Sequence, residues 1–160
     1  MNPTLSLTAV VQWLHILAGM TWLGTHIFHD FVLWPALLRR PVSEAQATFE
    51  SVEISVRPLS IGSSMAVMLL GIVRGTLLGP IRSLEIVFTT PYGLTWLAAL
   101  VLVITLMVWS ARWYRALPAK VWDEGQVRPD ARQNIRRGTI FSTAILGAIL
   151  ACMVLVRFGL

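Results

Sequence analysis

Four stretches of the chain consist almost entirely of apolar residues, and polar or charged segments separate them. They run roughly over residues 7–29, 59–79, 93–113 and 138–158. Each is about 20 residues long, the length at which a helix crosses the hydrocarbon core of a membrane. Short connections between antiparallel spans favour helices that run up and down beside one another. The pattern therefore predicts an all-α integral membrane protein, an up-and-down four-helix bundle that forms one domain over residues 1–160.

Two polar connections join the spans, one over about residues 36–57 and the other over about residues 114–137. In the first, apolar and acidic residues alternate imperfectly after Pro41, and Ser43 is a suitable helix N-cap. We expect a short amphipathic helix on the membrane surface there. Pro58 follows, and because proline favours the first turn of a helix, we expect it to open the second span.

Charged residues make up only 13% of the sequence, about half of what a soluble domain of this size carries, which excludes a soluble fold. The net charge is +5, and most of the cations lie in the two polar connections. The positive-inside rule places these connections in the cytoplasm and both chain termini outside. Basic loops beside a membrane favour anionic lipid over nucleic acid, so membrane lipid is the expected partner.

All three histidines, His15, His26 and His29, lie within or at the edge of the first apolar stretch. Helical spacing puts them near one face of one helix. An ionisable group within a span is costly, so such groups usually face the protein interior and mark a functional site. The pattern predicts a metal or haem site, and His15 is the histidine that packing alone explains least well. His26 is equally well explained as a packing residue, and His29, beside Asp30, as a residue at the membrane interface.

Residues of the second span are candidates to complete such a site. Met65 and Met68 offer thioethers, which suit Cu(I), although methionines in apolar helices usually fill space. Arg74 either extends its charge to the outer surface or pairs with an anionic ligand such as a haem propionate. Gly71 and Gly75 share a helix face, which lets a neighbouring helix or a flat cofactor approach the backbone.

The position of the histidines limits how a haem is held. Because every histidine is on the same helix, one chain cannot place a haem between histidines of two different helices. The site then needs an open or methionine sixth position, or a second chain that supplies another His15. A symmetric homodimer with the first span at its interface is one expectation, and a larger membrane complex is another.

The first span resembles that of the bacterial copper-resistance D (CopD-like) membrane family. The string LHILAGMTWLG, followed by FVLWPALLRR, contains in the family's order His15, Trp22, Gly24, Pro35 and Ala36. The later string PYGLTWLAALVLVITL is similar to a span that the family begins with Tyr-Gly. The bare four-span size is closer to the related HemJ-type protoporphyrinogen oxidases, which are thought to hold haem b. The resemblance implies a multi-pass protein of a bacterial inner (cytoplasmic) membrane that handles haem or copper.

Three functions follow from these patterns, and the first is favoured. It is a haem-b-binding redox protein, a candidate membrane oxidoreductase, with His15 as axial ligand and Arg74 on a propionate. The second is a copper-binding or copper-transport protein, whose site would comprise His26, His29, Met65 and Met68. The third is a non-catalytic accessory subunit of a membrane complex. The sequence assigns no catalytic residue.

Overall fold

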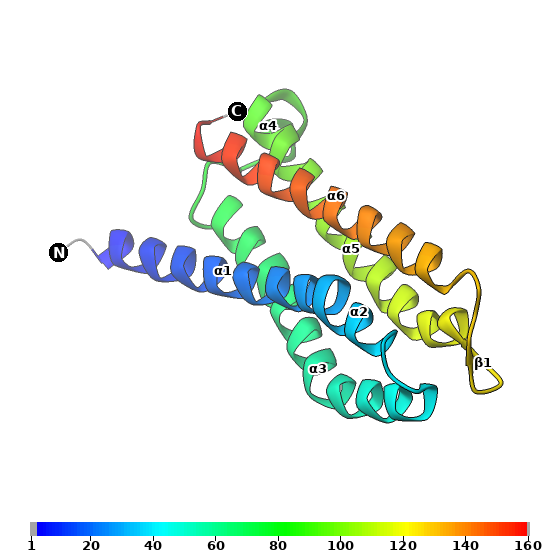
Figure 1. The fold of residues 1–160 in the computed structure, drawn as a ribbon. Helices are drawn as coiled ribbons and strands as arrows, with labels where there is room; N and C mark the ends of the chain where they lie inside the picture. The colour runs from blue at the N-terminus through cyan, green and yellow to red at the C-terminus, as the bar shows by residue number, and fades with distance from the viewer. Residues whose placement is uncertain (1–2, 160) are drawn as a thin grey trace.

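The computed structural model describes residues 3–159, with side chains from residue 6 onward. The described chain is helical apart from its loops and one small β-hairpin (Figure 1). The elements, in chain order, are α1 (Pro3–Ile27), a π-helical turn (Phe28–Leu33), α2 (Trp34–Leu37), α3 (Val42–Gly75), α4 (Leu84–Thr89), α5 (Pro91–Val121), β1 (Trp122–Asp123), β2 (Gln126–Val127) and α6 (Ala131–Arg157).

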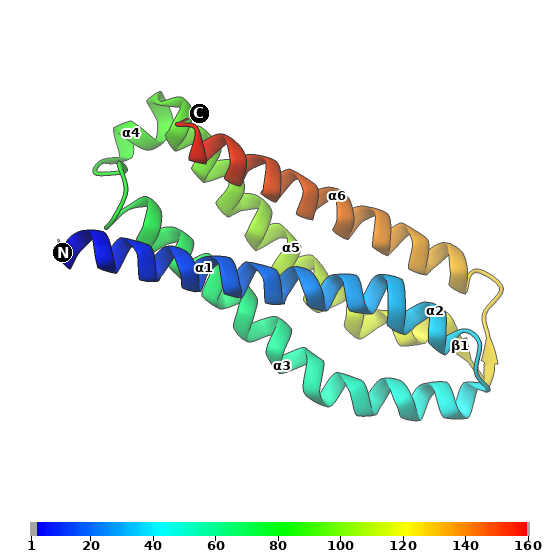
Figure 2. The ribbon, with the colours of Figure 1, turned by 60° about the vertical axis from the view of Figure 1, so that its left-hand side comes forward.

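Four helical segments are long and apolar enough to cross a membrane: Ser6–Leu37, α3, α5 and α6. This confirms the predicted all-α four-helix membrane bundle. Most large side chains on the outer surface of the spans are apolar, as a surface in contact with acyl chains requires. The beginning of α1 and the end of α6 lie at one end of the bundle and the β-hairpin at the other (Figures 1 and 2). We call these the terminal end (residues 6–12, 76–92 and 150–159) and the basic end (residues 34–57 and 112–137).

The helices pack as two pairs. α1 lies along α3, and α5 lies along α6, and the two pairs converge at the basic end and diverge towards the terminal end (Figures 1 and 2). At the basic end, an aromatic cluster of Trp34, Phe49 and Trp122 joins α2, α3 and the β-hairpin. Trp34 is completely buried there. The aromatic cluster therefore holds the basic end of the molecule together, because aromatic side chains bury large apolar areas.

A second apolar core lies further along the spans and takes one residue or more from each of them. Trp22 of α1 packs in it with Val67 of α3, Leu106 of α5 and Leu146 of α6. All four side chains are buried. This core separates the two polar regions of the molecule that are described below.

The expected surface helix and second span form one continuous helix, so the prediction that Pro58 opens the span was wrong. Pro58 lies in the middle of α3. An interior proline lacks an N–H donor and clashes with the carbonyl of the preceding turn, so it bends a helix whose two halves are held by packing. α3 is bent accordingly (Figure 2). Its first half buries Ala45 and Phe49 in the core of the basic end, and this packing keeps it helical.

The loop around the β-hairpin is held by exposed ion pairs. The guanidinium of Arg128 lies 3.2 Å from Asp123 and 3.3 Å from Asp130. The side-chain amide of Asn134 donates a hydrogen bond to Asp130 at 3.0 Å. This bond and the Arg128 guanidinium lower the pKa of Asp130. Because these groups are in water, they stabilise the loop only weakly.

Candidate functional site

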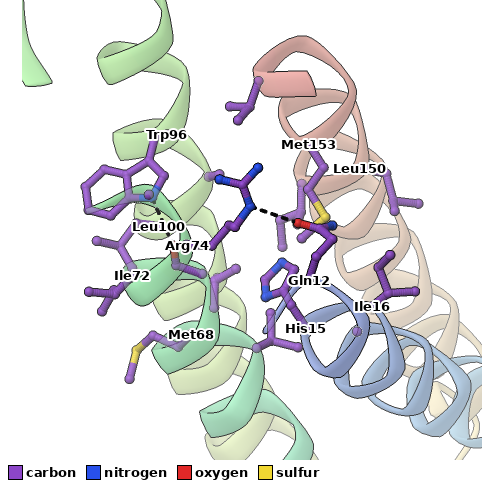
Figure 3. Close-up of a pocket in the computed structure, with 18 of the residues that line it drawn as sticks. Gln12, His15, Ile16, Met68, Ile72, Arg74, Trp96, Leu100, Leu150 and Met153 are labelled. Carbon is purple, nitrogen blue, oxygen red and sulfur yellow. Dashed lines mark hydrogen bonds between the residues drawn. The ribbon is translucent and has the colours of Figure 1, made fainter. Parts of the chain in front are cut away.

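A cavity of about 550 Å³ lies between the two helix pairs, towards the terminal end (Figure 3). All four spans contribute to its wall, most of which is apolar. Its polar lining residues are Gln12, His15, Arg74, Tyr92, Trp96 and Arg157. An apolar cavity of this size with a few convergent polar groups is typical of a small-molecule site.

His15 lies at the wall of this cavity, on the part of α1 that faces α3 (Figure 3). Its ring packs against Gly71, where a Cβ would lie 3.3 Å from Cε1 and 3.8 Å from Nδ1. Nδ1 is buried without a hydrogen-bond partner, although the backbone carbonyl of Val67 lies near the ring. Such a nitrogen has lost its hydration without compensation. Because Nδ1 is covered on the side of α3, a ligand in the cavity can reach the imidazole, the commonest metal ligand in proteins, only through its other ring nitrogen, Nε2.

Arg74 lies near His15, on α3 (Figure 3). Its Nε donates a hydrogen bond to Oε1 of Gln12 at 3.2 Å, and a terminal nitrogen donates to the carbonyl of Leu78 at 3.5 Å. Among the described residues, no carboxylate forms an ion pair with Arg74. A guanidinium held in an apolar wall by neutral partners favours a ligand with a carboxylate or phosphate group.

The two glycines of α3 make room for side chains of neighbouring helices. Gly71 accommodates the His15 ring, and a Cβ at Gly75 would lie 2.2 Å from Nε1 of Trp96. That Nε1 donates a hydrogen bond to the carbonyl of Gly71 at 3.3 Å, which ties α5 to α3 along one wall of the cavity. The sequence left two roles open for the face with Gly71 and Gly75, helix packing and room for a flat cofactor. In the structure this face is closely packed.

Replacing Gly75 by alanine is expected to destabilise the protein by about 2 kcal/mol, because Trp96 must move and lose its bond to Gly71. Gly62→Ala is the matched control on the same helix, since nothing lies within 4 Å of a Cβ there. This control is expected to be neutral or stabilising, because alanine favours a helix over glycine. Denaturant unfolding in detergent micelles measures both. Equal stability of the two variants would contradict the packing described here.

A second polar group is buried on the other side of Trp22, around the π-helical turn. In that turn the N–H of Trp34 bonds the carbonyl of His29, five residues back. A regular α-helix would bring the ring of Pro35 against the carbonyl of residue 31, and a widened turn relieves this clash. The turn buries both His29 and the adjacent Asp30.

His29 forms a buried hydrogen bond with Glu53 of α3. Its Nε2 lies 2.7 Å from Oε1 of Glu53, and the guanidinium of Arg57 holds the other carboxylate oxygen at 2.9 Å. Both His29 and Glu53 are buried, whereas Arg57 is half exposed. The bundle thus encloses His29, and Glu53 satisfies the polar side chain there. Its partner Glu53 is 24 residues away in the chain, and no local pattern announces the pair.

Asp30 connects the two helix pairs. Its carboxylate accepts hydrogen bonds from the hydroxyl of Tyr114 on α5, at 3.0 Å, and from the hydroxyl of Ser142 on α6. The ring of Tyr114 stacks on His29 and lies edge-on to His26. His26 bonds the carbonyl of Trp22 through Nδ1, and its Nε2 is buried without a partner. This polar group thus ties α1, α5 and α6 together near the basic end.

The residues predicted for a copper site do not gather in one place. His26 and His29 lie on the basic side of Trp22, and Nε2 of His29 is already bonded to Glu53. Met68 lines the cavity, whereas Met65 is exposed. Within the described residues, no group of three His, Cys, Asp or Glu side chains is placed to hold a metal ion. The predicted site residues that the cavity does bring together are His15, Met68, Gly71, Arg74 and Gly75.

Several polar residues of the two regions were not predicted as site residues from the sequence: Gln12, Glu53, Tyr92, Trp96, Tyr114, Ser142 and Arg157. Trp and Tyr are typical of the membrane interface, so Trp96 and Tyr92 were not recognised as residues of the cavity wall. Gln12 carried a usable signal, because it is a polar residue one helical turn before His15 in an otherwise apolar span.

No known protein family, characterised protein or solved structure matches the chain. What the site can do follows from its chemistry. It offers an imidazole, a guanidinium that no carboxylate of the described residues pairs with, and a mostly apolar wall. Together these suit a largely apolar ligand that carries anionic groups and accepts a nitrogen ligand.

Proposed function

We propose that the cavity binds haem b, with His15 as an axial ligand and Arg74 paired with a propionate. The observation that carries this proposal is the His15 imidazole at the wall of an apolar cavity, beside an Arg74 guanidinium that pairs with no carboxylate of the described residues. Haem b is a flat apolar macrocycle with two carboxylates and an iron that takes imidazole. A second cation, Arg157, also lines the cavity, at the terminal end.

The lining of the cavity limits which group could be the second axial ligand of the haem. His26 and His29 lie beyond Trp22 and do not line the cavity, so a second histidine of the same chain is not at hand. Three methionines do line it: Met20, Met68 and Met153. An open position, a methionine thioether or a second copy of the chain is compatible with this wall.

Bound haem would supply one-electron chemistry. The protein would surround the haem and act as a membrane oxidoreductase. His15 would hold the haem in place, and its imidazole would tune the reduction potential of the iron. The apolar wall excludes water, which strengthens the attraction between Arg74 and an anionic group. Gln12 keeps the Arg74 guanidinium oriented at the cavity wall through its hydrogen bond.

The test is the absorption spectrum of the detergent-purified protein, with haem measured per chain. We expect a Soret band and one haem per chain in the wild type. Arg74→Gln is expected to bind haem about tenfold more weakly, because a charge-assisted hydrogen bond is lost. Arg82→Gln is the matched control, since this exposed arginine bonds Leu77 outside the cavity, and it should behave as the wild type.

A wild type that purifies colourless and takes up no added haem would contradict the proposal. If such a preparation retained one copper per chain and lost it in Met65→Ala, the copper function would replace it. Co-purification of a stable partner without pigment or metal would instead support the accessory-subunit function.

A further inference from the structure

The wall of the cavity is open on one side, between α1 and α6. Ile16 and Met20 of α1 and Leu150 of α6 line the cavity, yet they are 44%, 65% and 50% exposed. A side chain that both lines a cavity and faces outward stands at its mouth. Figure 3 places Ile16 and Leu150 together on the same side of the cavity. α1 and α6 also diverge from one another towards the terminal end (Figures 1 and 2).

The opposite side, between α3 and α5, is closed. Trp96 fills the space above Gly75, and its hydrogen bond to Gly71 joins the two helices there. Met68 and Leu100, which line the cavity on this side, are both partly buried. The cavity therefore has a defined mouth rather than a uniformly loose wall.

The mouth lies at hydrocarbon depth. Ile16 is about 15 Å along the helix axis from Ser6, where the first span begins, and Leu150 is about 10 Å from Arg157, where the last span ends. The hydrocarbon core of a membrane is about 30 Å thick. The opening therefore faces acyl chains, whereas the two cations of the cavity, Arg74 and Arg157, lie nearer the terminal end.

We propose that the cavity exchanges its ligand directly with the bilayer, through a lateral portal framed by Ile16, Met20 and Leu150. The ligand is then an amphipathic anion dissolved in the membrane, with its apolar body at portal depth and its charge towards Arg74 and Arg157. This is the orientation that a lipid-dissolved molecule already has in the leaflet next to the terminal end. The portal itself follows from the cavity wall, and its use by haem rests on the proposed function.

A test that does not need haem uses protein reconstituted in vesicles that contain a phospholipid with a diazirine in its acyl chain. After illumination, we expect mass spectrometry to find the label on Leu100 and Met153, inside the cavity. Ile16→Trp and Leu150→Trp each fill the portal and should reduce this internal label about tenfold, the effect of an overpacking barrier. Leu69→Trp, on an exposed position of α3 that does not line the cavity, is the matched control. Absence of internal label in the wild type, or internal label unchanged in both portal variants, would overturn the portal.

The same variants show whether haem uses the portal. Apo-protein in vesicles is mixed with haem-loaded donor vesicles, and growth of the Soret band is followed. We expect Ile16→Trp and Leu150→Trp to load about tenfold more slowly than Leu69→Trp. Failure of every variant and of the wild type to bind haem would contradict the proposed function, and the acyl-chain label would then decide the portal alone. Normal haem loading in both portal variants would overturn lateral entry.

Discussion

The His15→Ala variant is expected to insert and fold as the wild type does but to purify without haem. Its imidazole lines the cavity and is the proposed ligand, and alanine offers the iron no ligand. We expect haem to bind at least about a hundredfold more weakly, since even changes to residues that only support a metal ligand reach this size. Folding should survive, because the ring is only partly buried and lies against Gly71 at the edge of an existing cavity. Absorbance of the purified variant, with circular dichroism for helix content, measures both effects.

The neighbouring substitution Leu14→Ala provides the control. Leu14 is exposed on α1 and does not line the cavity, so its loss should leave the spectrum unchanged. A His15→Ala variant that keeps the full Soret band would show that any haem in the protein is held elsewhere.

Asp30→Ala should reduce the free energy of unfolding by about 3 kcal/mol, the largest stability effect that we expect from a polar residue. The substitution leaves the hydroxyl of Tyr114 without its acceptor and removes the bond of Ser142 to Asp30, at the place where the two helix pairs meet. The Ser142 hydroxyl keeps the carbonyl of Thr139 as acceptor. Two lost hydrogen bonds to a charged group and one buried donor left unsatisfied contribute to that cost. Measured hydrogen bonds between membrane helices are weaker on average, so the expected value includes both bonds rather than one.

Unfolding in mixed micelles measures this cost, with Asp123→Ala as the exposed control. The triple variant Asp30→Ala, Tyr114→Phe and Ser142→Ala removes the donors together with the acceptor. It should be more stable than Asp30→Ala alone, because no buried donor is left unpaired. An Asp30→Ala variant as stable as Asp123→Ala would show that the carboxylate does not hold the helix pairs together.

The bundle was predictable because its spans are decided by composition. A stretch of about 20 apolar residues meets the length of the hydrocarbon core whatever lies around it. The helix ends were not predictable in the same way. Pro58 and Pro118 both lie inside helices, because tertiary packing and the bend of the helix outweigh the usual effect of proline on helix ends. The π-helical turn before Pro35 had no sequence pattern of its own either.

The candidate site divides along the same line. His15 and Arg74 were predictable because an ionisable residue in a span is costly wherever it occurs. The buried polar group near the basic end was not predictable, since it depends on contacts between distant parts of the chain. Ser142 is 112 residues from Asp30, and neither residue indicates the other in the sequence. Helical spacing placed the three histidines near one face, and in the structure the core around Trp22 separates His15 from His26 and His29.

Chemical rescue of a His15→Gly variant is the most direct measurement of whether the imidazole at this position coordinates haem iron. The purified variant is mixed with haem, and free imidazole is titrated into it while the absorption spectrum is recorded. We expect no Soret band of the bound form without imidazole, and its return to the wild-type shape as imidazole occupies the space left by the ring. A folded variant that binds haem equally well with and without imidazole, or one that imidazole fails to restore while the wild type binds haem, would contradict coordination by His15.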